Sequence, residues 1–296
     1  MIPMEWKKVV RKVYSRSIQK RLGYADNTKL LIIHADDLGL SLSENSASIE
    51  ALKIGIVTSG SVMVPCAGFE GIANFARNNP EADIGIHLTL TSEWNEYKWG
   101  PIAPAKTVES ITDRNGCFLS NNKELKEVFL PEHIEYELRS QINKALEAGI
   151  DITHIDSHMF VAFSDPAILR TFNKLAKEFR LPLLLRYSLP LWFLAPPSKI
   201  IVDNLYYARS SHLGTGLKNY YSSVLTSLKP GLNCILIHPS YDTPEMQQLT
   251  SMQSEYGSKW RQEDFDFFTG EECRELINRN SIHLITWREI RDKLIR

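Results

Sequence analysis

The chain has 296 residues, of which 43% are hydrophobic and 23% are charged, a composition typical of ordinary globular proteins. Its length suits one large α/β domain, because a barrel of eight βα units needs about 250 residues. The formal net charge of −1 gives no reason to expect a nucleic-acid partner.

Residues 4–23 carry apolar side chains at helical spacing, with a series of Lys and Arg between them. A basic amphipathic helix of this kind can lie on an anionic membrane surface. We favour the simpler interpretation, an extra helix that packs on the domain and exposes its basic side. The sequence is therefore divided into a basic helical extension (1–28) and a catalytic domain (29–296).

From residue 29 onward, strand-like runs alternate with helix-like runs. The predicted strands are 29–35, 56–64, 84–90, 152–156, 183–187, 231–238 and 282–287, with a weaker eighth candidate at 208–212. The predicted helices are 43–54, 68–78, 131–149, 165–180 and 270–280, the first with Ser43 as its N-cap and Gly55 as its end. This alternation predicts a single α/β domain with a mostly parallel sheet, as a distorted or incomplete (β/α) barrel.

Two stretches interrupt this pattern, residues 92–130 and 188–230. The first holds Trp94, Tyr97 and Trp99, which either form an apolar wall for a sugar ring or attach the long loop to the barrel. No glycine-rich nucleotide-binding motif follows the first predicted strand.

Acidic and imidazole side chains stand at the C-terminal ends of the predicted strands. Asp36 and Asp37 follow the first strand, and His87, His158 and His238 come at the ends of three later ones. In parallel barrels, catalytic groups gather at this edge. One Asp and two His from separate strands make a three-ligand metal set with open positions, and the spare Asp can act as a base.

The two neighbouring carboxylates require a bend. Side chains alternate along a regular strand, so Asp36 and Asp37 would point in opposite directions. Both can reach one metal only if the chain turns at this point, and Gly39 supplies a residue suited to such a turn.

Each of these residues also has a plainer interpretation. A lone buried His is more often a hydrogen-bonded core residue than a ligand, Asp-Asp is a common turn, and His-Pro often only ends a strand. We assign no role to five further histidines, although His154 shares a strand face with Asp156 and is a candidate for a supporting position: His34, His133, His154, His212 and His283.

Four motifs follow one another in a specific order and spacing: HADDLGLSLSENSASIEALKIGIVTSGSVMVP, DIGIHLTLT, THIDSH and IHPSYD. In these motifs the chain resembles the YdjC-like carbohydrate deacetylases, which include chitooligosaccharide deacetylases and are relatives of the NodB-type polysaccharide deacetylases. The resemblance implies a distorted β/α barrel with one divalent metal held by Asp37, His87 and His158. It also implies that Asp36 is the catalytic base and His238 the general acid.

The implied reaction removes an acetyl group from an N-acetylated amino sugar or oligosaccharide, by attack of metal-bound water on the acetamide. Two imidazoles and a carboxylate suit Zn²⁺, Fe²⁺, Co²⁺ or Mn²⁺ better than Mg²⁺, whereas members of this family are often described with Mg²⁺. We keep both Mg²⁺ and Zn²⁺. The chain departs from the pattern at Phe160, where these proteins usually carry a further His, and the choice of substrate stays open.

Other functions are kept as alternatives: a non-catalytic or altered-specificity carbohydrate-binding relative, or a metal-dependent hydrolase of another ester, amide or phosphoester. A non-haem iron oxygenase also uses two His and one carboxylate, but normally on an all-β scaffold. The expected partner is a small-molecule or oligosaccharide substrate. The four cysteines are widely separated and the N-terminus lacks the apolar core of a secretory signal, so we expect a cytoplasmic location.

Overall fold

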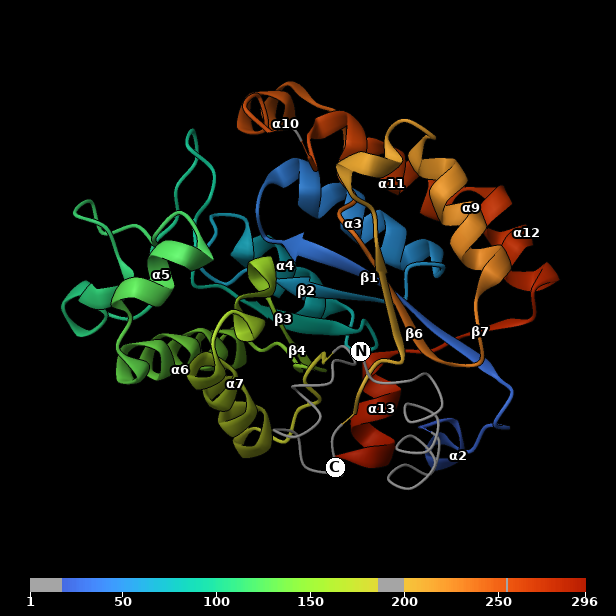
Figure 1. Cartoon of the computed structure of the whole chain (residues 1–296), viewed down its shortest axis with the longest axis horizontal. Coiled ribbons are helices and arrows are strands. Elements are labelled where there is room, and N and C mark those ends of the chain that lie inside the picture. Colours follow the sequence, from blue (N-terminus) through green and yellow to red (C-terminus); the bar gives the residue numbers. More distant parts are fainter. Residues whose placement is uncertain (1–17, 186–199, 254) are drawn as a thin grey trace, which may run out of the picture.

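The computed structural model describes residues 18–185, 200–253 and 255–296 (Figure 1). Its strands are β1 (Lys29–Leu38), β2 (Ser59–Val62), β3 (Ile84–Leu88), β4 (Ile155–Ser157), β5 (Asn204–Tyr207), β6 (Gly231–Ile237) and β7 (Ile282–Leu284). Its helices are α2 (Ile18–Leu22), α3 (Leu42–Ile54), α4 (Phe69–Asn78), α5 (Asn122–Val128), α6 (Pro131–Glu147), α7 (Pro166–Glu178), α9 (Leu217–Ser227), α10 (Pro244–Leu249), α11 (Ser258–Thr269), α12 (Glu271–Arg279) and α13 (Trp287–Leu294).

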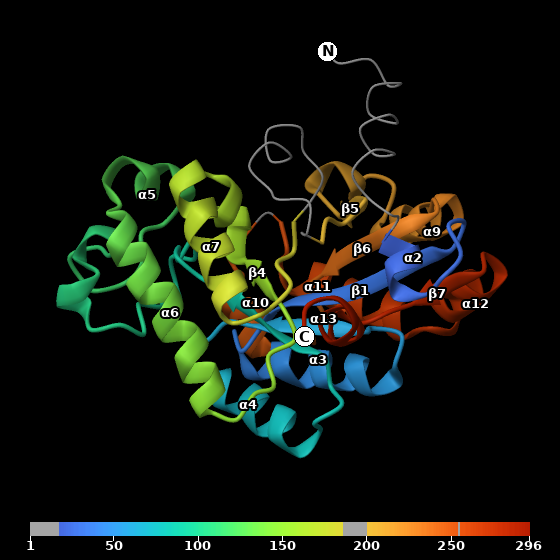
Figure 2. The ribbon, with the colours of Figure 1, turned by 90° about the horizontal axis from the view of Figure 1, so that it is seen from below.

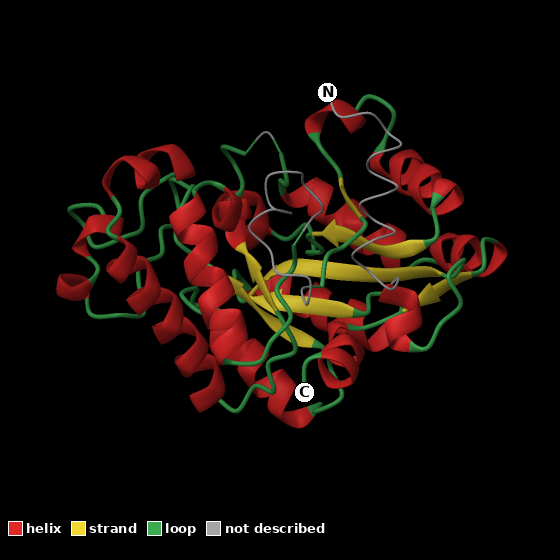
Figure 3. Ribbon diagram, turned by 60° about the horizontal axis from the view of Figure 1, so that its bottom comes forward, coloured by secondary structure: helices red, strands yellow, loops and turns green. Residues whose placement is uncertain are grey.

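The seven described strands form one sheet in the order β4-β3-β2-β1-β6-β5, with β7 paired to β1. Every pairing is parallel, as expected when helices connect successive strands. The sheet is curved and helices surround it (Figure 3). β4 and β5 end the series without pairing to each other, so the fold is the incomplete barrel that the alternation predicts.

The alternation of side chains along each strand separates two apolar layers. On β1, Leu31 and Ile33 join the large core against the outer helices, whereas Leu30 and Ile32 join a smaller core with α2 and α13. In the outer layer, α6 lies beside α7, next to β4 (Figure 2). The smaller core occupies the inner, concave side of the sheet, and it reaches the edge where the site residues stand.

Several predicted boundaries were wrong. Helix α3 begins at Leu42 and is capped by Ser41, because Ser41 accepts a hydrogen bond from the amide of Glu44; Ser43 donates to Glu245 instead. Of the predicted strand at 183–187, the described part contributes a single bridge between Leu183 and Ile155, and residues 186–187 lie outside the described residues. The eighth candidate at 208–212 is not a strand, and the strand in this region is β5.

Most of the predicted amphipathic helix at 4–23 lies outside the described residues, and its described end is α2. In α2, Ile18 and Leu22 are buried against the smaller core. None of the helices in the described part of the chain is both long and apolar enough to cross a membrane.

Candidate active site

The sheet brings the predicted site residues to one edge of its inner side. On β1, the positions that follow Leu30 and Ile32 on the inner side are His34 and Asp36. His87 on β3 has the same orientation because its neighbours Ile86 and Leu88 point into the outer core.

Asp37 departs from this alternation, as the sequence predicts. Its φ of 66° places it in the left-handed region, which few residues other than glycine adopt. Gly39 follows with a φ of 94°, where an added Cβ would lie 3.1 Å from the carbonyl oxygen of Met63. The bend therefore turns Asp37 toward the same space as Asp36.

Three predicted ligands meet at this bend. Oδ1 of Asp37 lies 3.5 Å from Nε2 of His87 and 3.4 Å from Nδ1 of His158. Two metal–ligand bonds of about 2.0–2.1 Å span such a separation when they meet at a roughly tetrahedral angle. All three residues are buried, and one ligand atom from each lies within 4.8 Å of the others. This donor set and its spacing fit a divalent ion such as Zn²⁺.

In each candidate ligand, the side-chain atom that faces away from the metal position has a hydrogen-bond partner in the protein. Nδ1 of His87 donates to Asp156 at 2.8 Å, and Nε2 of His158 donates to Glu93 at 2.9 Å. Carboxylates in this position fix which nitrogen of an imidazole faces a metal. Oδ2 of Asp37 accepts a hydrogen bond from Arg261 at 2.9 Å. These hydrogen bonds fix the orientation of the three side chains, so that Oδ1 of Asp37, Nε2 of His87 and Nδ1 of His158 face one another.

Arg261 is a buried cation shared by two carboxylates. It is 2% exposed and donates to Asp37 and to Glu44, each at 2.9 Å. Burial by itself would raise the pKa of Asp37, but the hydrogen bond from His158 and the charge of Arg261 hold that pKa well below its usual range. Burial raises the pKa of Glu44 well above its usual range despite Arg261. Arg261 thus favours the ionised form of Asp37, whereas burial disfavours the ionised form of Glu44.

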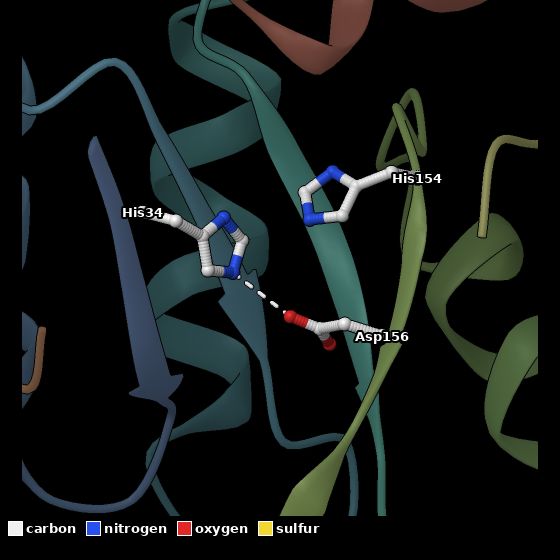
Figure 4. Close-up of side chains that lie close together, drawn as sticks. All are labelled: His34, His154 and Asp156. Atoms are coloured by element: carbon white, nitrogen blue, oxygen red, sulfur yellow. Dashed lines mark hydrogen bonds and ion pairs between the residues drawn. The ribbon is translucent and has the colours of Figure 1, made fainter. Parts of the chain in front are cut away.

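His34 lies between Asp36, the predicted base, and Asp156, the carboxylate that accepts a hydrogen bond from His87. Figure 4 shows the contact between His34 and Asp156. Nε2 of His34 donates to Asp156 at 2.8 Å and lies 3.0 Å from Oδ1 of Asp36. Burial would lower the pKa of His34, but these two carboxylates raise it to about 10. His34 is thus a buried imidazolium that touches both acidic residues at once.

His154 lies farther from the candidate ligands and faces His34 with a ring separation of 4.9 Å (Figure 4). Its Nδ1 is 2.9 Å from the hydroxyl of Thr153, and its ring packs against Gly85, where an added Cβ would lie only 2.3 Å away. Glycine is therefore required on β3 for this packing. His154 lies beside this network, with one ring nitrogen within 4.8 Å of atoms of His34 and Asp156.

The imidazole of His238 stands on the other side of Asp36. Its Nε2 lies 3.9 Å from Oδ2 of Asp36 and 4.0 Å from Oδ2 of Asp37, and its ring packs on Tyr256. Burial lowers the pKa of His238 to about 4, assisted by the charge of Arg261. The imidazole is therefore neutral near pH 7.

These groups open into a pocket of about 280 Å³. Trp94 lines it and stacks on Arg261, whereas Trp99 is 3% exposed and donates to the carbonyl of Thr91. Tyr97 accepts a hydrogen bond from the amide of Ala67. These contacts indicate that Tyr97 and Trp99 attach the long loop to the rest of the domain. Trp94 instead forms part of the pocket lining.

Glu93 and Arg261 were not found by sequence reasoning, because neither lies at the end of a strand. The remaining histidines make contacts elsewhere, with Ser110, Tyr220 and Tyr24: His133, His212 and His283.

Comparison with known proteins places this site in a family. Residues 30–279 match the family described as YdjC-like protein. The chain belongs to the YdjC-like family. A carbohydrate deacetylase from Brevibacillus brevis is 33% identical over 264 residues, which is 88% of this chain and 99% of the relative. Another from Thermus thermophilus is 30% identical over 284 residues, 93% of this chain and 98% of the relative.

A solved structure of similar fold supports the YdjC-like assignment. It comes from Enterococcus faecalis V583 and bears a provisional name as a cellobiose-phosphate cleavage protein. It is 26% identical, covers 89% of this chain and 99% of its own, and superimposes with a TM-score of 0.74. The fold of this YdjC-like chain is thus found over nearly the whole length of a solved relative.

Proposed function

We propose that this protein is a metal-dependent carbohydrate deacetylase that releases acetate from an N-acetylated amino sugar or oligosaccharide. One observation carries the proposal: the convergence of Asp37, His87 and His158 beside a second carboxylate, Asp36, in an open pocket. The relatives named carbohydrate deacetylases, which are matched over nearly their whole length, support the same class of reaction. A divalent ion, Zn²⁺ or Mg²⁺, would acidify a water molecule there and polarise the amide carbonyl.

Asp36 is the base in this proposal. Its Oδ1 lies 3.0 Å from His34, which fixes the carboxylate, and its Oδ2 is directed toward the side where His238 stands. Asp36 takes a proton from the attacking water while the water oxygen bonds to the carbonyl carbon. The C–N bond then breaks, and the amine nitrogen needs a proton to leave.

His238 delivers that proton in our proposal, and its lowered pKa sets a condition. Because the imidazole is neutral near pH 7, it must gain the proton during the reaction. Asp36 is the proposed source, since 3.9 Å between its Oδ2 and Nε2 of His238 is a gap that one bridging water can span. An imidazolium with a pKa near 4 is then a strong acid toward the amine.

The test combines metal analysis with acetate release. The purified protein, loaded with Zn²⁺ or Mg²⁺, is assayed on N-acetylglucosamine and its short oligomers. We expect acetate release by the parent, and a loss of about 10²–10⁴-fold in Asp36→Asn with metal content unchanged. Asp26→Asn, which alters an exposed carboxylate, is the matched control. Binding of these sugars without acetate release would instead support a non-catalytic carbohydrate-binding protein.

Metal content tests the ligand assignment separately. His87→Ala and His158→Ala are each expected to lose stoichiometric metal, because each removes one of three ligands. Full metal occupancy in either variant would exclude that residue as a ligand.

A further inference from the structure

One side of the pocket is apolar beyond what an acetyl group needs. Six pocket-lining side chains make up this apolar wall: Met159, Phe160, Phe163, Leu184, Tyr207 and Leu236. Leu184 and Leu236 are each 4% exposed, so they form its deep part, and Met159 is 50% exposed and forms its outer part. Other lining residues are polar, among them Glu93, Gln253 and Glu255.

The wall is continuous with the inner core of the barrel. Leu184 and Leu236 belong to the smaller core, and Phe160 and Tyr207 pack against it. The rings of Phe160 and Tyr207 are 5.4 Å apart, a contact distance for paired aromatic side chains. These side chains therefore present a firm surface.

The backbone that carries Phe160 is strained. Met159 and Phe160 both have left-handed conformations, with φ of 51° and 53°, directly after the candidate ligand His158. Consecutive left-handed residues other than glycine are rare, and such strain concentrates at functional sites. The strain points to a role for the wall in binding.

We propose that the substrate is an amphiphilic amino sugar, in which an apolar aglycone attached to the N-acetylated sugar lies on the apolar wall. This inference rests on the proposed function. A single methyl of an acetyl group covers only a small part of six apolar side chains. A second sugar can stack one ring face on Phe160 or Tyr207, but its equatorial hydroxyl groups would find few hydrogen-bonding partners among the other wall residues, which is unfavourable. The polar lining groups, Glu93 and Gln253 among them, are available to the sugar hydroxyls.

The test compares the methyl and hexyl β-glycosides of N-acetylglucosamine on the metal-loaded protein. We expect kcat/KM to be at least about tenfold higher for the hexyl glycoside, because burying each methylene favours binding. Met159→Gln and Phe160→Gln are expected to reduce this ratio toward one. Leu146→Gln, at an exposed apolar position on α6, is the matched control and is expected to keep the ratio.

Two results would overturn the inference. Equal kcat/KM for the two glycosides would mean that the wall does not take an aglycone. Faster hydrolysis of N-hexanoylglucosamine than of the hexyl glycoside would assign the wall to the acyl group. If neither glycoside nor the N-acetylglucosamine oligomers release acetate, the proposed function fails. Calorimetric binding of the two glycosides then decides the inference alone, with at least about tenfold tighter binding of the hexyl compound expected.

Discussion

Replacing Arg261 with Met tests whether this buried cation is what allows two carboxylates to lie inside the protein. Arg261 donates to both Asp37 and Glu44, and all three side chains are at most 7% exposed. Removing one partner of a buried ion pair costs about 3–5 kcal/mol, because the remaining charge is uncompensated. We expect a loss of that size in the free energy of unfolding of metal-free Arg261→Met near pH 8.

The loss should shrink as the pH falls. Without the guanidinium, the pKa of Asp37 rises from its present low range, and that of Glu44, already raised by burial, rises further. A carboxyl whose folded-state pKa exceeds the unfolded value, about 4, stabilises the fold when protonated. That stability is lost as the pH rises through the folded-state pKa. The deficit of the variant is therefore expected to be smaller at pH 5 than at pH 8.

Arg291→Met is the matched control, because it also removes a buried arginine. Arg291 is 3% exposed, but the side chain of its partner Asp151 is 47% exposed and also pairs with Arg288. Water can solvate that carboxylate, so we expect a loss of only about 1–2 kcal/mol. Urea denaturation in the presence of a chelator measures both variants. Equal losses at pH 8, or a deficit of Arg261→Met that grows toward pH 5, would refute this reasoning.

Three further outcomes are expected. His34→Gln should keep the metal and lower kcat by roughly 10–100-fold, because the buried charge of His34, 3.0 Å from Oδ1 of Asp36, no longer holds that carboxylate in place. Unchanged kcat would remove His34 from the site. His238→Ala should hydrolyse activated acetate esters as well as the parent does but fail on amides, because only an amine leaving group needs a proton. Equal losses of kcat/KM on the esters and on the amides would argue against the acid role of His238. Metal affinity should rise with pH. The carboxylates of Glu93 and Asp37 outweigh the effect of burial and raise the pKa of His158 to about 10, so a bound metal must displace a proton from His158. Calorimetry in buffers of different ionisation enthalpy should show proton release near pH 7, and the absence of proton release would contradict this prediction.

The site residues that could be predicted from the sequence share one property: they end apolar runs. His87, for example, follows three residues that read as a buried strand, so its place at the sheet edge is set by local pattern alone. The bend at Asp37 was also predictable, because period-two alternation forbids two adjacent side chains from meeting without it. Both predictions of position agree with the structure.

Arg261 and Glu93 could not be predicted in this way, because their positions depend on long-range packing. Arg261 meets Asp37 across 224 residues of chain, and no local pattern marks that pairing. The sequence does contain boundary residues for helix α11, which carries Arg261. Gly257 and Gly270 flank the helix, and the aromatic residue Trp260 lies in its first turn. The helix was not predicted, because the sequence around it is polar and shows no clear apolar periodicity.

Asp156 connects the candidate metal ligand His87 to the proposed base Asp36. Its Oδ1 accepts from His87 and its Oδ2 accepts from His34, each at 2.8 Å, and His34 in turn lies against Asp36. Burial would raise the pKa of Asp156, but the two imidazoles hold it well below its usual range, so the carboxylate stays ionised between them. A shift of this one carboxylate would move a ligand and the base together. The geometry needed for a bound ion and for proton transfer is therefore preset by hydrogen bonds within the protein, which lowers the rearrangement required when substrate arrives.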